Sequence, residues 1–223
     1  MKRIKVLLVE DHTVVREGLR NLLELEDDIE VIGEAPEGRQ GVELAKKLRP
    51  DVVLMDIAMP RLNGLEASRQ ILAALPASKV VILSAYSDEA YVTHTNESGA
   101  RGFLLKHTSA DNVCRAIREV QKGNTFFSPT ISKRLKRQNK LDRNGDAKAP
   151  AARLSPREVE VLQLIAEGCA NKEMAQELKI STKTVEKHRQ HIMEKLDVHD
   201  TAGLTRYAIR TGVIENGVRL TIV

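Results

Sequence analysis

The N-terminal half of the chain alternates short apolar runs with segments that have the period of an amphipathic helix. The apolar runs cover residues 4–9, 30–35, 52–55, 80–83 and 102–105, and the helical segments cover residues 14–24, 39–48, 65–74, 89–98 and 110–122. Continuous apolar runs are typical of strands buried on both faces, as in a parallel sheet covered by helices. The pattern therefore predicts a doubly wound α/β domain of the flavodoxin-like (βα)₅ type.

Polar side chains follow four of the five predicted strands. Glu10 and Asp11 follow the first strand, Asp56 the third, Ser84 the fourth and Lys106 the fifth. Because the carboxyl ends of parallel strands meet at one edge of the sheet, where ligands of such folds bind, we expect all five side chains to converge. The alternative is that these polar residues are only solvated and have no function. That alternative would explain one acidic residue at one strand end better than it explains five suitable residues at four strand ends.

Three carboxylates held together repel one another, and a hard divalent cation relieves the repulsion. Mg²⁺ typically takes one or two carboxylates, several waters and a phosphate oxygen. We expect Asp11 and Asp56 to be direct ligands and Glu10 to hold a coordinated water. A carboxylate beside such a cation can attack a phosphoryl group. Lys106 then offers a positive charge to the phosphoryl oxygens, and Ser84 offers a neutral donor.

The C-terminal half has helical periodicity only. A first helical segment begins at Ser155-Pro156, has Val159, Leu162 and Ile165 on one face and ends at Gly168. A second, shorter segment carries Met174, Ala175 and Leu178. In the third segment, residues 182–196, apolar or amphipathic side chains recur at helical spacing and leave Lys183, Lys187 and Gln190 on the opposite face. A fourth segment covers about residues 201–211. Two short helices around a tight turn predict a helix-turn-helix within an all-α four-helix domain.

Several helix starts are marked by capping residues. Thr108 and Asp111 have the spacing of a capping box, and Ser155-Pro156-Arg157-Glu158 combines a cap, a proline at the first helical position and a glutamate at the third. We expect further caps at Asn171 and Ser181.

The length of the chain and the distribution of its charges indicate two domains that bind different partners. The chain has 223 residues, which suits two domains better than one. Residues 1–127 carry 17 Lys and Arg against 19 Asp and Glu, whereas residues 128–223 carry 18 against 12. The basic half is therefore the one that we expect to meet a polyanion. Residues 128–152 are rich in breakers and polar side chains, so we predict domains at 1–127 and 153–223 joined by a linker.

Other features of the sequence argue against several classes of protein. No segment has the length and hydrophobicity of a membrane span or signal peptide, so we expect a cytoplasmic protein without a membrane partner. The two cysteines, Cys114 and Cys169, lie in helical patterns and are expected to be buried. Neither a GxGxxG motif nor a P-loop is present, which argues against nucleotide binding. An aspartate-dependent phosphatase usually has a second acid two residues after its nucleophile, and that place is taken by Ala58.

The motifs VEDH, DIAMP, LSAY and GARGFLLK, spread over residues 3–122, resemble the receiver domain of response regulators. The resemblance implies that Asp56 is the phosphoacceptor, that Glu10, Asp11, Asp56 and the backbone carbonyl of Ala58 hold Mg²⁺, and that Lys106 and Ser84 contact the phosphoryl group. Phe103 occupies the place of the aromatic switch residue, which is often Tyr in the family. Thr95 and Asn96 stand in the segment of the fourth helix where smaller or apolar residues are expected, which indicates either an altered dimerisation mode or a mobile helix.

The run from Leu154 to Val198 resembles the LuxR-type helix-turn-helix, so the whole chain looks like the NarL/FixJ subfamily. The resemblance implies that residues 182–196 form the recognition helix. Residues implied to face base edges or phosphates are Asn171, Lys172, Lys183, Thr184, Glu186, Lys187, His188 and Gln190. Lys suits guanine and Gln suits adenine, while the carboxylate of Glu186 suits only a cytosine amino group unless it pairs with a neighbour on its own helix.

Together these features predict a two-component response regulator. A histidine kinase would phosphorylate Asp56, and phosphorylation would control homodimerisation and binding to double-stranded DNA. The chain would not be an enzyme beyond its own phosphoryl transfer and autodephosphorylation. Three alternatives stay open: a regulator that works without phosphorylation, a quorum-type ligand sensor, which would need a cavity-forming N-terminal domain, and a C-terminal helical module for protein interaction. His188 and His191 lack the further ligands that a metal pair needs.

Overall fold

The computed structural model describes residues 3–85, 95, 98–127 and 154–214. The chain divides into two compact units, Met1–Leu141 and Asp142–Val223. The predicted linker at 128–152 and most of the predicted helix at 89–98, including Asn96, lie outside the described residues, while Thr95 is described and fully buried.

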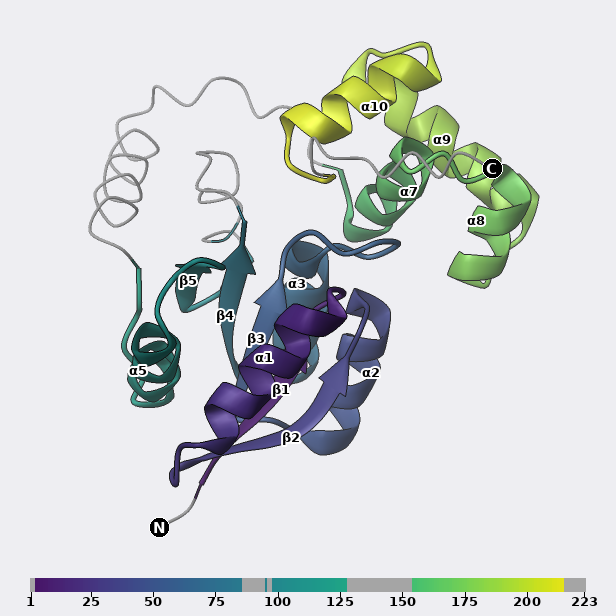
Figure 1. Ribbon diagram of the computed structural model, residues 1–223. Helices are drawn as coiled ribbons and strands as arrows, with labels where there is room; N and C mark the ends of the chain where they lie inside the picture. The colour runs from purple at the N-terminus through teal and green to yellow at the C-terminus, as the bar shows by residue number, and fades with distance from the viewer. Residues whose placement is uncertain (1–2, 86–94, 96–97, 128–153, 215–223) are drawn as a thin grey trace. The chain divides into compact units, whose positions relative to one another are not determined.

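The N-terminal unit is built on a five-stranded parallel sheet (Figure 1). Its strands are β1 (Ile4–Val9), β2 (Ile29–Ala35), β3 (Val52–Asp56), β4 (Lys79–Ser84) and β5 (Gly102–Leu105), in the order β2-β1-β3-β4-β5. The connecting helices are α1 (Thr13–Glu24), α2 (Gly38–Leu48), α3 (Gly64–Ala74) and α5 (Ala110–Gln121). The doubly wound fold predicted from the apolar runs is confirmed, and the bounds of the described elements differ from the predicted ones by at most one residue at either end.

The sheet is buried on both faces at its centre, because β1, β3 and β4 carry runs of four apolar side chains there, whereas the edge strand β2 is mostly only partly buried. Successive residues of a strand point to opposite faces. Leu7 and Val53 thus lie in the core cluster shared with α2 and α3, whereas Leu8 and Leu54 lie in the cluster shared with α1 and α5. This is why the strands appear in the sequence as continuous apolar runs.

Helix α5 begins at Ala110 as predicted, but its cap differs from the prediction. The N-cap of α5 is Ser109, one residue after Thr108, and its side chain makes no capping hydrogen bond. The backbone N–H of Thr108 instead donates to the carbonyl of Leu105 at 2.9 Å, and its hydroxyl accepts from Asn112 at 3.4 Å. The capping box expected from Thr108 and Asp111 is wrong, because the turn after β5 takes up Thr108 before the helix begins.

The C-terminal unit consists of helices α7 (Pro156–Ala166), α8 (Asn171–Leu178), α9 (Thr182–Leu196) and α10 (Thr201–Arg210) (Figure 1). They enclose one apolar core, to which α7 contributes Val161 and Leu162, α8 Met174, α9 Val185 and Ile192, and α10 Leu204. The four-helix domain predicted from the 3.6-residue period is confirmed.

Two of the three caps predicted in this unit are confirmed. Ser155 and Glu158 form a complete capping box, and Ser181 accepts from the backbone N–H of Thr184 at 3.1 Å. The third prediction is wrong: Asn171 is the first residue of α8, and the N-cap position is held by Ala170. Alanine has no side-chain acceptor, so only the return hydrogen bond is present, from the Ala170 N–H to Glu173 at 2.7 Å.

Both cysteines are free thiols. Cys114 is buried on α5 as expected, but Cys169 is only partly buried, because it follows α7 in the turn before α8. Among the described residues, no helix combines the length and the hydrophobicity that a membrane crossing requires.

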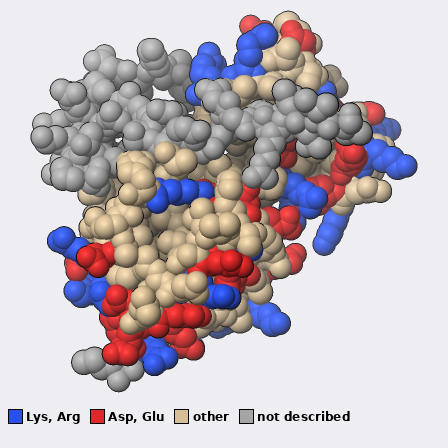
Figure 2. Space-filling view, in the orientation of Figure 1, with Lys and Arg blue, Asp and Glu red and all other residues tan. Residues whose placement is uncertain are grey.

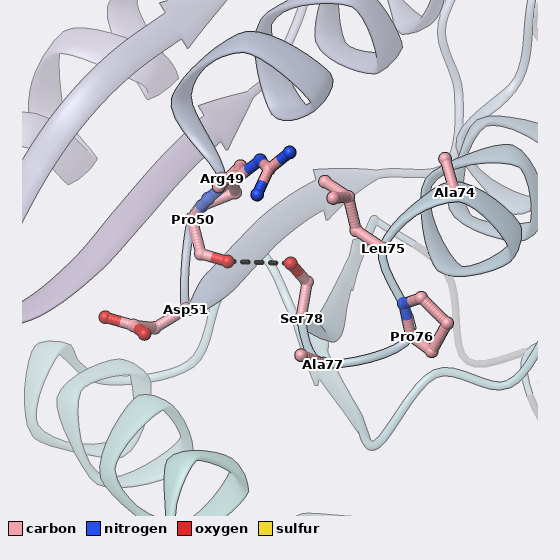
Figure 3. Close-up of a pocket in the computed structure, with 8 residues that line it drawn as sticks. All are labelled: Arg49, Pro50, Asp51, Ala74, Leu75, Pro76, Ala77 and Ser78. Carbon is pink, nitrogen blue, oxygen red and sulfur yellow. Dashed lines mark hydrogen bonds between the residues drawn. The ribbon is translucent and has the colours of Figure 1, made fainter.

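A hollow of about 340 Å³ lies where β3 and β4 begin (Figure 3). It is lined by the segment from Arg49 to Asp51 and the segment from Ala74 to Ser78, and the hydroxyl of Ser78 donates to the carbonyl of Pro50 at 2.7 Å. Because it lies at the amino ends of the strands, it is at the opposite edge of the sheet from the polar residues that follow them.

Candidate functional site

The acidic residues predicted from the strand ends are brought together by the order of the strands. The order reverses between β1 and β3, which is the place where doubly wound sheets open a crevice beyond their carboxyl ends. Glu10 and Asp11 follow β1 there, and Asp56 is the last residue of β3. One possible ligand atom from each of Glu10, Asp11, His12 and Asp56 lies within 4.8 Å of those of the others. Glu10 and Asp56 are 1% and 0% exposed.

Lys106 joins this cluster from the end of β5. Its ammonium nitrogen lies 2.9 Å from Glu10 Oε1 and 2.9 Å from Asp56 Oδ2. Burial lowers the pKa of Lys106, but the charges of Asp56 and Glu10 outweigh burial, so the net pKa is raised. Lys106 therefore carries its positive charge at neutral pH and neutralises part of the acidic cluster.

Asp56 is held in an environment that disfavours its charge. Burial, and then the neighbouring charge of Glu10, raise its pKa from 3.8 to about 7, although Lys106 acts in the opposite direction. A carboxylate kept at the edge of ionisation has much to gain from a further positive charge.

The residues present fit a hard divalent cation. All three acids offer carboxylate oxygens, the ligands that Mg²⁺ prefers. Among the described residues, Glu10 Oε2 is a buried oxygen without a hydrogen-bond partner, so the cluster has a coordination position to offer. Ala58 lies against the same site, because its backbone N–H is 3.4 Å from Asp56 Oδ1.

Ser84 lies on β4, the strand next to β3, and Phe103 lies on β5, the strand beyond it. Ser84 ends β4 and is fully buried, and its backbone carbonyl accepts from the N–H of Lys106 at 2.8 Å. Phe103, on β5, is 1% exposed and packs in the core cluster that also holds Met55 and Ile57. Its ring is thus inside the unit.

Two residues near the cluster were missed by the sequence argument. His12 Nδ1 lies 2.7 Å from Asp11 Oδ1 and 3.1 Å from Glu10 Oε1, and the signal available was its position directly after the acidic pair. Gly64 begins α3 so close to β3 that a Cβ there would lie 1.8 Å from the carbonyl oxygen of Asp56. The turn signal Asn63-Gly64 marked this position, but its contact with the site depends on the fold.

The helix-turn-helix is formed by α8, a short turn and α9. Lys179 closes α8 in the left-handed conformation, with φ of 53°, and Ser181 caps α9. The side chains that resemblance assigns to DNA are distributed over the surface of these helices: Lys172, Lys183, Glu186, Lys187 and Gln190 are exposed, and Asn171, Thr184 and His188 are partly buried. In the structure Gln190 donates to Glu194 at 2.9 Å.

A hollow of about 510 Å³ lies between these two helices and is lined by Lys172, Lys179, Ser181 and Thr182, among others. The N-terminal end of α9 opens onto it, where backbone N–H groups and the helix dipole favour an anion. Figure 2 shows that Lys and Arg are interspersed with Asp and Glu over the visible face of the N-terminal unit, so that face offers no basic surface of this kind.

The comparisons with known proteins agree with both halves of this geometry. Residues 6–118 match the family described as response regulator receiver domain, and residues 152–208 match the family described as bacterial regulatory proteins, luxR family. The chain is a response regulator of the NarL/FixJ type. The receiver carries the acidic cluster, and the LuxR-type domain carries the helix-turn-helix.

Whole-length relatives share this arrangement. The response regulator is 41% identical to the transcriptional regulatory protein LiaR of Bacillus subtilis (strain 168), over 95% of this chain and 99% of the relative. It is 35% identical to the transcriptional regulatory protein DegU of Brevibacillus brevis, over 96% of each. Among solved structures it is similar to the response regulator RcsB in complex with DNA, with a TM-score of 0.57, 27% identity and coverage of 94% and 99%. The protein belongs to a family of DNA-binding transcription regulators.

Proposed function

We propose that Asp56 is the phosphoacceptor and that a histidine kinase is its phosphodonor. The observation that carries the proposal is the meeting of three carboxylates and Lys106 at the point where the strand order reverses. Mg²⁺, held by Glu10, Asp11, Asp56 and the carbonyl of Ala58, would supply positive charge to the phosphoryl oxygens. In autodephosphorylation a water molecule attacks phosphorus, the phosphorus–oxygen bond to Asp56 breaks, and inorganic phosphate and the free carboxylate are released.

The residues of the receiver have separate tasks in the transfer. A carboxylate oxygen of Asp56 attacks phosphorus as the phosphorus–nitrogen bond to the kinase histidine breaks. Lys106, already 2.9 Å from Asp56 Oδ2, exchanges this ion pair for one with a phosphoryl oxygen. Ser84 donates its hydroxyl to another phosphoryl oxygen. The fixed backbone around the site supplies orientation at no cost during the reaction.

Phosphorylation would be signalled through Ser84 and Phe103. A shift of Ser84 toward the phosphoryl group changes the packing beside the buried ring of Phe103, and without a hydroxyl on that ring the change is one of packing alone. The altered receiver surface favours a homodimer. Two DNA-binding domains on adjacent half-sites then bind with greater avidity than one. We propose the boundaries 1–127 for the receiver, 128–152 for the linker and 153–223 for the DNA-binding domain.

In the DNA-binding domain we propose that α9 enters the major groove. Its exposed Lys183, Glu186, Lys187 and Gln190 face base edges, and Asn171, Lys172, Thr184 and His188 lie near phosphates. The hydroxyl of Thr184 lies 2.8 Å from that of Ser181 at the helix start, where a phosphate is favoured by the helix dipole.

The test of the phosphoacceptor measures molar mass by light scattering and affinity for DNA, with Mg²⁺, before and after addition of beryllofluoride, a phosphoryl mimic. The wild type is expected to become a dimer and to bind DNA more tightly. Asp56→Asn should show neither change. Asp51→Asn is the matched control, because Asp51 lies just before the other end of β3. A wild type that does not respond, or an Asp56→Asn variant that does, would contradict the proposal.

The test of the recognition helix compares Lys187→Ala with Lys46→Ala, a change of the same kind on the exposed face of α2. Binding is measured to duplexes selected from a random pool. Lys187→Ala is expected to lose a base contact, which costs about 1–3 kcal/mol of binding free energy and relaxes the sequence preference at one position. Lys46→Ala is expected to keep the wild-type affinity. If the wild type, Lys187→Ala and Lys46→Ala bound DNA equally, Lys187 would not contact the bases.

A further inference from the structure

Arg16, on α1, contacts the backbone of the acidic cluster. Its guanidinium Nη1 donates to the carbonyl oxygen of Glu10 at 2.7 Å, and its side chain is only 15% exposed. Glu10 stands just beyond β1, and its own N–H donates to the carbonyl of Ala35 at 3.0 Å. The peptide group that links Glu10 to Asp11 is therefore fixed by Arg16 after the strand has ended.

Glu34 holds Arg16 in this place. Its Oε2 lies 3.5 Å from Arg16 Nε, and its Oε1 accepts from Arg20 Nη1 at 3.1 Å. Because Glu34 lies on β2 next to Ala35, both partners of the Glu10 backbone are anchored to the same strand. A planar guanidinium with donors in a rigid fork is suited to bridge a carboxylate and a carbonyl in this way.

We propose that Arg16 is a positioning residue for the cation site: it orients the Glu10–Asp11 peptide so that both carboxylates point toward one divalent cation. The inference rests on the proposed function of the cluster. Groups that orient metal ligands through hydrogen bonds typically contribute about 10- to 100-fold to metal affinity. The charge of Arg16 acts in the other direction, because a guanidinium near the site repels Mg²⁺. The two effects of its removal therefore have opposite signs.

The experiment measures Mg²⁺ affinity of the full-length protein by isothermal titration calorimetry. Arg16→Gln is compared with Arg20→Gln. The control removes one positive charge from the same helix, and Arg20, like Arg16, is an ion-pair partner of Glu34. Arg16→Gln is expected to bind Mg²⁺ about 10-fold or more weakly. Arg20→Gln is expected to stay within about 2-fold of the wild type or to bind more tightly, because it loses only a repelling charge.

The outcomes separate the inference from the function on which it rests. A wild type that does not bind Mg²⁺ would overturn both. A wild type that binds, with Arg16→Gln equal or tighter, would overturn the positioning role alone. Circular dichroism checks that each variant is folded. If Arg16→Gln does not fold, Arg16→Lys replaces it: that variant keeps the charge, so wild-type affinity would overturn the proposal and weaker binding would support it.

Discussion

Replacing Asp56 by asparagine is expected to stabilise the metal-free receiver at neutral and higher pH. Asp56 is fully buried beside Glu10, and burial and that neighbouring charge raise its pKa from 3.8 to about 7. In the unfolded chain the carboxyl group ionises near its ordinary value. The folded state therefore holds a proton that the unfolded state has already released, and the protein loses stability as the pH rises through this window.

The magnitude follows from the two pKa values. At about 1.4 kcal/mol per pH unit, the difference corresponds to about 4 kcal/mol. Asparagine does not ionise, so Asp56→Asn should equal the wild type below about pH 4, gain on it as the pH rises, and level off about 4 kcal/mol more stable above about pH 7. Mg²⁺ should offset more than half of this difference, because it stabilises only the charged site, by about 2.7 kcal/mol at 100 times its dissociation constant.

The assay is equilibrium urea unfolding at several pH values, followed by hydrogen exchange in peptides from β3, so that unfolding of the receiver is separated from that of the DNA-binding domain. Asp51→Asn is again the control, because Asp51 lies just before β3, at the end of the strand away from the acidic cluster. If Asp56→Asn were no more stable than the wild type near pH 8 without Mg²⁺, the claim that the site disfavours the charge of Asp56 would be refuted.

Three further predictions concern other buried contacts. In α7, burial raises the pKa of Glu158, but hydrogen bonds, including one from Lys195 at 2.7 Å, outweigh it and the net pKa is lowered. Glu158→Gln should therefore cost about 1–2 kcal/mol at neutral pH, a cost that fades as the pH falls below the ordinary glutamate value, in urea unfolding read from α9. Gly64→Ala should cost about 3 kcal/mol or more and abolish Mg²⁺ binding in calorimetry, because the new Cβ would collide with the Asp56 carbonyl. Phe103→Tyr should cost about 1–3 kcal/mol in urea unfolding, because it buries a hydroxyl among apolar side chains.

The sequence alone determined the fold class and the meeting of the acidic side chains and Lys106 at one edge of the sheet. Leu7, Leu8, Val53 and Leu54 are apolar without interruption because β1 and β3 are covered on both faces, and this property is visible in a window of a few residues. Once a parallel sheet is accepted, residues that follow its strands must share an edge. The helix caps Ser155 and Ser181 were also predicted correctly, because a cap and its partner are only three residues apart and both are visible in a short window of sequence.

The tertiary structure decided the contacts between different elements around the site. The ammonium of Lys106 lies between Glu10 and Asp56, Arg16 turns back to the Glu10 carbonyl, and Gly64 touches the Asp56 backbone. Periodicity reports which face of an element is buried, but it does not report what the opposing element places there. The strand order and the close packing of α1 and α3 against the sheet make these contacts, so they follow from the fold as a whole.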